Sequence, residues 1–406
     1  LQPKTLMGEI PTVEIQQLPV VSAPPGAEKV KLTLRSVSFE GVTVYQPSEL
    51  EPLYADKIGE AISLADVYAL AAAATKKYRD DGYILSQVTV PPQTISAGSI
   101  RLKVIEGFIG KITVEAVSAD RHIGSLDRIR GMASHIGNEK GPLNYGRLER
   151  ALLLINDLPG IKARSILSAS KTTAGASDLQ IIVDRKMYDG EASVDNFGTR
   201  FLGPVQMTGA VSLNSQFFKN DEKLTLQGAL APSKDLSGTE LTYISFGYLQ
   251  PILDNGLSLQ LTGTSSVTDP GYTLKSFDVR GVSEYLAASL NYSFIRSRTL
   301  NLNGRAMFDY RDVTSTTNVD RRVDHIRALR AGARFEALDM ALGAPAFNSV
   351  DVEVAKGLNM LGASKKGLTT LSRPDGLPDF FKTNIEIQRL HHRKHAIRRL
   401  FLTRPR

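Results

Sequence analysis

Residues 78–110 read YRDDGYILSQVTVPPQTISAGSIRLKVIEGFIG, and this stretch decides the fold of the first part of the chain. Residues 84–90 alternate apolar and polar side chains, and residues 99–106 do the same after a short turn, which predicts two strands. The first strand ends at Pro91, because proline lacks the backbone donor that a strand needs. The stretch therefore predicts a strand pair that follows a helix.

The residues around this pair complete a small module over residues 29–110. Residues 30–39 alternate as a strand does, and Pro47 opens a short helix. Residues 64–78 are rich in Ala and Leu, and Ser63 is placed to cap this second helix. The predicted order is strand, helix, helix, strand, strand. An ordinary small α+β domain also fits this spacing.

Residues 111–184 repeat the same order. The predicted elements are a strand, two helices and two strands, at residues 111–117, 126–136, 144–157, 161–167 and 179–184. The second helix is the clearest, because its apolar residues recur on one face. Two tandem modules of one order are a more specific signal than either module alone.

Three pieces of these modules resemble a known family. Residues 78–83 (YRDDGY) and 104–107 (VIEG) resemble the first POTRA domain of ShlB/FhaC/HecB-like two-partner secretion transporters. Residues 148–160 (LERALLLINDLPG) resemble the second POTRA domain of that family. The resemblance implies an α+β fold with two β-α-α-β-β POTRA modules, followed by an antiparallel transmembrane β-barrel.

Beyond residue 185 the helical periods stop and alternating segments follow one another. Clear examples are residues 256–265, 286–294, 300–310, 348–356 and 381–388. Such segments of about ten residues are typical of membrane barrels, although a soluble β-sandwich also alternates. Further pieces resemble the transporter family: VDNFGTR at 194–200, DPGYTL at 269–274 and FIRSR at 294–298. We therefore predict a barrel over residues 185–389 with about ten strands.

The two ends of the chain break the pattern. Residues 1–28 are rich in Pro and Gln and predict an extended linker, preceded either by a removed signal peptide or by further chain. Residues 390–406 are basic and do not alternate, and the strand count falls below what the resemblance implies. We expect a C-terminal truncation there, by a frameshift or a premature stop, and an incomplete barrel that does not conduct.

The composition excludes several kinds of chemistry. The chain has no Cys, and it has no hydrolase, P-loop, dinucleotide or zinc-protease motif, so we predict no catalytic, cofactor or metal site. We interpret His391, His392 and His395 as part of the tail, and Asp80 and Asp81 as a solvated turn. The net charge of +7 comes mostly from the tail, so we expect no nucleic-acid partner.

The resemblance implies a function in protein export. It implies a location in the cell outer membrane of a Gram-negative bacterium, with the POTRA modules in the periplasm and the barrel in contact with outer membrane lipid. The implied partner is a secreted exoprotein, a haemolysin or adhesin, in unfolded form. The resemblance also implies that export uses no ATP. An exposed strand edge pairs with an extended client through main-chain hydrogen bonds. The predicted client-binding edge consists of Ile84, Leu85, Ser86, Gln87, Val88, Thr89 and Val90. The alternatives are a periplasmic polypeptide-binding POTRA module that does not conduct, and an outer-membrane enzyme, for which a hydrolase motif is lacking.

Overall fold

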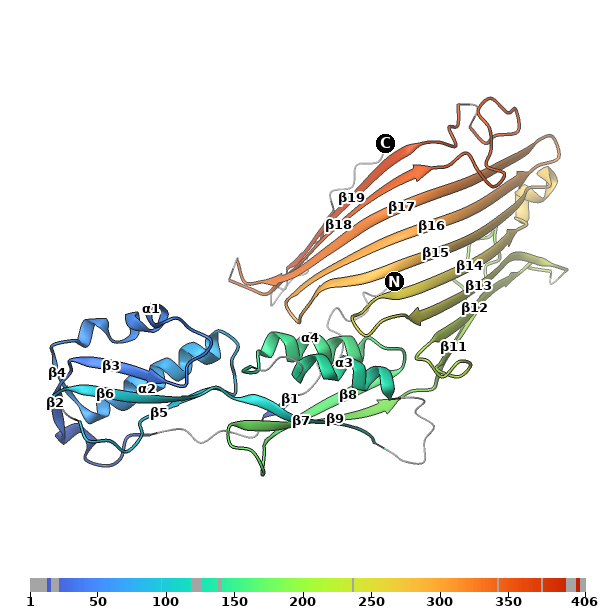
Figure 1. The fold of residues 1–406 in the computed structure, drawn as a ribbon. Helices are drawn as coiled ribbons and strands as arrows, with labels where there is room; N and C mark the ends of the chain where they lie inside the picture. Colours follow the sequence, from blue (N-terminus) through green and yellow to red (C-terminus); the bar gives the residue numbers. More distant parts are fainter. Residues whose placement is uncertain are drawn as a thin grey trace. The chain divides into compact units, whose positions relative to one another are not determined.

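The computed structural model of the chain describes residues 13–15, 22–95, 97–117, 126–137, 141–235, 237–341, 343–373, 375–391 and 399–401. The chain divides into two compact units. The first contains both small modules and ends at Asp184, and the second contains the long strands from Arg185 onward (Figure 1). None of the helices in the described ranges is long and apolar enough to cross a membrane.

The first module has the predicted β-α-α-β-β order. Its main elements are β3 (Ser36–Glu40), α1 (Pro47–Leu50), α2 (Leu64–Asp80), β5 (Gln87–Thr89) and β6 (Ser99–Ile105). The three strands form a sheet in the order β3-β6-β5, with β3 parallel and β5 antiparallel to β6. Three short 3₁₀ turns also occur, η1 (Ala27–Lys29), η2 (Glu51–Leu53) and η3 (Ala55–Lys57).

The core of this module lies between α2 and the sheet. One face of α2 is buried, and it consists of Val67, Leu70, Ala71, Ala74 and Tyr78. Ser63 caps the helix as predicted, because its hydroxyl accepts a hydrogen bond from the backbone N–H of Asp66. The helix therefore has a fixed start and packs one complete stripe against the strands.

The strand predicted at residues 30–39 is wrong as a single element. The chain forms β2 (Lys31–Thr33), breaks at Leu34, and continues as β3. β2 pairs with β4 (Ala61–Ser63), whereas β3 pairs with β6 in another sheet. The backbone N–H of Leu34 donates to Glu60, so the chain changes partner at this residue although the alternation continues.

The strand predicted at residues 84–90 is shorter than its alternation indicates. Only Gln87–Thr89 pair with β6, and they form the edge of the sheet, as predicted. Ser86 donates its backbone N–H to Tyr83, which closes a turn, and Leu85 is buried there. The apolar side chains at the start of this stretch therefore belong to a packed turn.

The second module repeats the β-α-α-β-β order, as predicted. Its elements are β7 (Phe108–Ala116), α3 (Asp127–Gly137), α4 (Tyr145–Asn156), β8 (Ile161–Ala169) and β9 (Ala176–Arg185). The sheet order is β1-β8-β9-β7, in which β1 (Val13–Ile15) comes from the predicted linker. Residues 13–15 are therefore not a free spacer, and the pattern could not show this because the segment is too short to alternate visibly.

The second unit is one long antiparallel meander, visible in Figure 1 as the large sheet. Its strands are β10 (Tyr188–Asp195), β11 (Gln206–Asn214), β12 (Lys223–Pro232), β13 (Thr239–Pro251), β14 (Ser258–Thr268), β15 (Arg280–Arg296), β16 (Leu300–Thr316), β17 (Arg321–Asp339), β18 (Ala346–Gly357) and β19 (Phe381–His391). These match the predicted number. The turn η4 (Tyr272–Phe277) precedes β15, and β20 (Arg399–Phe401) pairs with β19. Most of the predicted basic tail lies outside the described residues.

The two faces of this sheet distinguish a membrane barrel from a soluble sandwich. On β15, Leu286 and Leu290 are 60% and 46% exposed. On β18, Val352 and Val354 are exposed, whereas Asp351 on the opposite face of the same strand is buried. A soluble sandwich would bury the apolar face and expose the charged one. The sheet has the opposite arrangement, which is that of a β-barrel with an apolar outer face.

Candidate functional site

Of the predicted client-binding edge, Gln87, Val88 and Thr89 form β5, and the residues before them lie in the packed turn. The middle residue of β5 is covered. Val88 is 1% exposed, and Gln87 and Thr89 on either side are partly exposed. The backbone N–H of Val88 donates to the hydroxyl of Thr75 on α2, at 2.9 Å. The Thr75 hydroxyl in turn donates to the carbonyl of Ala71. Helix α2 therefore provides the hydroxyl that accepts the hydrogen bond from the free main-chain N–H of this edge strand.

This contact also shows which main-chain groups point away from the sheet. Ladder bonds alternate along an antiparallel pair, so an N–H bonded to a helix side chain is directed away from the neighbouring strand. The backbone N–H of Val88 thus points away from β6, whereas the main-chain groups of Gln87 and Thr89 point toward β6. A client strand that pairs with β5 therefore has to replace the Thr75 hydroxyl as the hydrogen-bond acceptor of the Val88 N–H.

The two family-like pieces of the first module meet at a partly buried carboxylate. Glu106 accepts hydrogen bonds from the Tyr78 hydroxyl at 2.8 Å and from the backbone N–H groups of Thr43 and Val44 at 2.8 and 3.1 Å. Burial acts to raise the pKa of Glu106, but the hydrogen bonds from Thr43, Tyr78 and Val44 outweigh it and hold the pKa below its ordinary value. Burial and the contact with Glu106 raise the pKa of the Tyr78 hydroxyl, which stays neutral and donates.

The same pieces also connect the first module to the second. The backbone N–H of Tyr145 donates to the carbonyl of Gly82, and the N–H of Leu143 donates to that of Gly107, both at 2.8 Å. Gly82 has a φ of +90°, a conformation that favours glycine. At Gly107 a Cβ would lie 2.5 Å from the backbone oxygen of Leu85. These family-like residues therefore have a structural role at the junction within the first unit.

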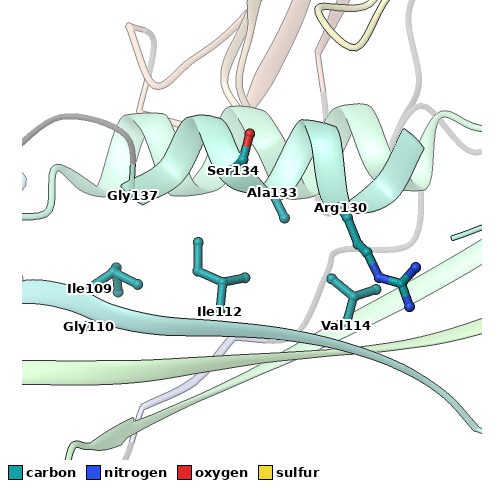
Figure 2. Close-up of a pocket in the computed structure, with 8 residues that line it drawn as sticks. All are labelled: Ile109, Gly110, Ile112, Val114, Arg130, Ala133, Ser134 and Gly137. Carbon is teal, nitrogen blue, oxygen red and sulfur yellow. The ribbon is translucent and has the colours of Figure 1, made fainter. Parts of the chain in front are cut away.

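A groove of about 370 Å³ lies in the second module between α3 and the edge strand β7 (Figure 2). Its lining is mostly apolar, with one guanidinium, and consists of Ile109, Gly110, Ile112, Val114, Arg130, Ala133, Ser134 and Gly137. Figure 2 shows Ile109, Ile112 and Val114 directed from β7 toward the helix. No pattern in the sequence indicates this groove, because it depends on how β7 and α3 pack against each other.

The charged face of the large sheet holds a network of ion pairs across β16, β17 and β18. Arg305 contacts Asp351 at 2.8 Å and Glu353 at 3.0 Å. Arg334 contacts Asp351 at 2.7 Å, and Arg330 contacts Glu353 at 3.3 Å. Arg330 also pairs with Asp309 on β16, so three arginines and three acids are joined in one network. Their charges balance, and the ion pairs hold the register of the three strands.

The other candidate polar groups have local partners or fall outside the described residues. Lys76 pairs with Asp80, and Asp81 contacts Lys77 and the Tyr45 hydroxyl. Hydrogen bonds from Tyr45 and then Lys77 lower the pKa of Asp81, as expected for a charged turn. His391 ends β19, while the histidines that follow it are not described. Across the described ranges, no group of His, Asp and Glu is arranged to hold a metal ion.

Tandem β-α-α-β-β modules followed by an inside-out antiparallel sheet define a class of protein, the POTRA-containing outer-membrane β-barrel proteins. Residues 32–107 match the family model of the ShlB-type POTRA domain. Residues 175–398, more than half of the chain, match the model of the haemolysin secretion/activation protein ShlB/FhaC/HecB. The chain belongs to this ShlB/FhaC/HecB family.

Individual relatives agree with this assignment. The heme/hemopexin transporter protein HuxB of Haemophilus influenzae is 27% identical over 270 residues, which cover 66% of this chain and 45% of that protein. The outer membrane transporter CdiB of Escherichia coli is 24% identical over 190 residues, 47% of this chain and 31% of the relative. The chain thus spans less than half the length of these curated relatives. The solved structure of CdiB from Escherichia coli shows the same fold, with a TM-score of 0.67 at 18% identity. The match covers 93% of this chain and 69% of the CdiB chain.

Proposed function

We propose that this chain acts in two-partner (type V) secretion as an outer-membrane transporter that recognises an unfolded exoprotein through periplasmic POTRA modules. The observation that supports this most strongly is the presence, in one chain, of two POTRA modules and an inside-out sheet of eleven strands, β10 to β20. Two-partner secretion requires both parts, since one recruits an extended client and the other spans the membrane. We retain the division into a linker (1–28), POTRA 1 (29–110), POTRA 2 (111–184), barrel (185–389) and basic tail (390–406) as a proposal.

In the proposed mechanism, the client pairs with the main chain of the first module. The site is the edge that begins at Ile84 and ends at Val90, with β5 at its centre. An extended client offers a carbonyl to the Val88 N–H in place of the Thr75 hydroxyl, and the client continues the sheet. No nucleotide or metal takes part in this step, and no nucleic acid is a partner.

The partner proposed here is a secreted exoprotein of the haemolysin or adhesin kind, held unfolded. The test is a pull-down by the immobilised chain of an exoprotein fragment, presented either freshly diluted from urea or already folded. Binding of the unfolded form alone is the expected result. Equal capture of the folded form contradicts recognition by strand pairing, because a folded client has no free main-chain groups to offer.

A second candidate function is favoured by the edges of the large sheet. Within the described ranges, β10 pairs only with β11, and β20 pairs only with β19. Each unpaired backbone group in hydrocarbon costs several kcal/mol, so an open sheet does not span a bilayer by itself. On this alternative, the chain binds polypeptide in the periplasm without conducting. Stable single-channel currents from the chain in planar bilayers support the pore, and their absence supports the alternative.

A further inference from the structure

The sheet of the second POTRA module is open along β7. This strand ends the sheet order β1-β8-β9-β7, and within the described residues it pairs only with β9. The backbone N–H of Val117 donates to the carbonyl of Val183, at 2.9 Å. In a parallel pair the main-chain groups of successive residues point to alternate sides, so those of Ile112, Val114 and Ala116 point away from β9. These groups form a row that a further strand can join.

A bulge in β7 places three apolar side chains on the face that α3 covers. The pairing register shifts at Gly110, which is an extra residue in the strand. Residues three positions apart normally lie on opposite faces of a strand, but the bulge puts Ile109 and Ile112 on one face. A Cβ at Gly137 on α3 would meet Ile112 at 3.4 Å and Ile109 at 4.0 Å. Figure 2 shows both side chains, together with Val114, directed toward α3.

The module itself does not cover these apolar side chains completely. The three β7 side chains are only partly buried, whereas Ile129 and Met132 on α3 are buried. On the helix side the groove is lined by the small residues Ala133, Ser134 and Gly137. The groove of about 370 Å³ is therefore open at the place where the apolar side chains of a further strand would pack.

One charged side chain lies at an end of this groove. Arg130 extends from α3, and its guanidinium lies beside Val114 (Figure 2). Within the described residues its only ion-pair partner is Asp127 on the same helix, at 3.0 Å. The two side chains are 57% and 83% exposed, so this pair contributes little and can be exchanged for another. A guanidinium beside an apolar groove favours an occupant with a carboxylate at that end.

We propose that the groove between β7 and α3 binds an extended polypeptide segment, which adds a strand to β7. The segment has apolar side chains at alternate positions, which pack on Ile112 and Val114, and an acidic side chain at the next such position, which pairs with Arg130. That this segment belongs to the unfolded exoprotein rests on the proposed function. The client then has a second contact besides β5, and two contacts on one extended chain raise the overall affinity.

Binding is tested with the full chain and a fluorescent peptide of sequence TVTVTDT, which carries its Val and Asp side chains on one face. Ser134→Phe fills the groove from an exposed position of α3. The matched control is His135→Phe, which adds the same ring at the next exposed position, outside the groove lining. Ser134→Phe is expected to weaken peptide binding about tenfold or more, and His135→Phe to leave it unchanged. Equal affinities of the two variants overturn the proposal.

The preference for an acidic segment is tested by exchanging the charges. Arg130 is exposed, so Arg130→Glu is compatible with the fold. This variant is expected to bind TVTVTDT about fivefold more weakly and TVTVTKT more tightly by a similar factor. If both peptides respond alike to the substitution, the guanidinium does not select a carboxylate and the proposal is wrong.

Strand addition is distinguished from simple apolar contact by hydrogen exchange over Phe108–Ala116, measured by mass spectrometry. The peptide is expected to slow the exchange of the Ile112 and Val114 N–H groups, because these donors face away from β9. Binding without this protection overturns strand addition. A dimer of the chain that the peptide dissociates and Ser134→Phe abolishes assigns the groove to a second copy, and also overturns the proposal.

The exoprotein is tested separately, as a fragment freshly diluted from urea. Weaker capture by Ser134→Phe than by His135→Phe supports the exoprotein as the occupant, and equal capture overturns it. A chain that binds the peptide as expected but captures no exoprotein supports the groove and contradicts the proposed function. Capture of the exoprotein without binding of the peptide overturns the groove and leaves the proposed function intact.

Discussion

The hydrogen bond between Thr75 and Val88 gives a direct way to perturb the proposed client edge. Thr75→Val keeps the shape of the side chain and removes the hydroxyl that accepts from Val88. Val88 is 1% exposed, so its N–H is then buried without a partner. An unsatisfied buried donor costs about 1–3 kcal/mol, and the unfolding free energy of the first module should fall by that amount. For a module of this size each kcal/mol lowers Tm by about 4–8 °C.

The same substitution should strengthen client binding. In the unaltered chain the client has to break the bond to Thr75 before it pairs with Val88, whereas in the variant it supplies a missing acceptor. A difference of about 1.4 kcal/mol corresponds to a tenfold gain in affinity. The assay is fluorescence anisotropy of a labelled, urea-diluted exoprotein fragment, at a temperature where both chains are folded.

Thr75→Ser is the matched control, since it keeps the hydroxyl and should leave both stability and affinity close to those of the unaltered chain. A Thr75→Val chain that is destabilised as expected but binds the fragment no more tightly would refute pairing at Val88. Thr89→Pro is a less suitable probe, because Thr89 faces β6 and its loss of an N–H damages the sheet itself.

Three further predictions follow from the first unit. Residues 29–184 expressed alone should be soluble and unfold cooperatively with mixed helix and strand, and a circular dichroism spectrum of coil alone would contradict this. Glu106 has a folded-state pKa below its ordinary value of 4.5, so its stabilisation is complete above about pH 4.5 and is lost as pH falls through the folded-state pKa. Glu106→Gln should lower the unfolding free energy by about 2 kcal/mol near neutral pH and make that free energy less dependent on acid pH, as measured by urea titration. If the acid dependence of the unfolding free energy is unchanged, Glu106 is not the source of that dependence. Gly107→Ala places a Cβ 2.5 Å from the Leu85 carbonyl oxygen and should destabilise the first unit in thermal melts by about 1–3 kcal/mol, whereas Gly141→Ala, where a Cβ meets no neighbour, should have little effect.

The order of the elements was predictable from the sequence because local chemistry determines it. Ser63 caps its helix through contacts within one turn, and the apolar stripe of α2 follows the helical period. The strands of the large sheet were predictable for the same reason, since the apolar and polar residues alternate within each strand by itself. β17 was harder to recognise, because Arg330 and Arg334 lie among small residues on its inner face.

The details of the candidate site depend on contacts between distant residues, and the sequence does not show these. The alternation at residues 84–90 does not reveal that Leu85 packs in a turn near Gly107. Nothing local connects Thr75 to Val88, or the linker strand to Ser165. The contact between Thr75 and Val88 decides which main-chain group of β5 is open, and therefore bears on how a client would bind.

Site-specific photocrosslinking in cells tests the central proposal, that an unfolded exoprotein pairs with the edge strand of the first POTRA module. A photoreactive amino acid replaces Gln87 on β5, or Asp56 in an exposed turn as the control. In cells that make the exoprotein, irradiation should give adducts of chain and client at Gln87 and none at Asp56. Adducts at Asp56 alone, or equally at both positions, would contradict recognition by this strand edge.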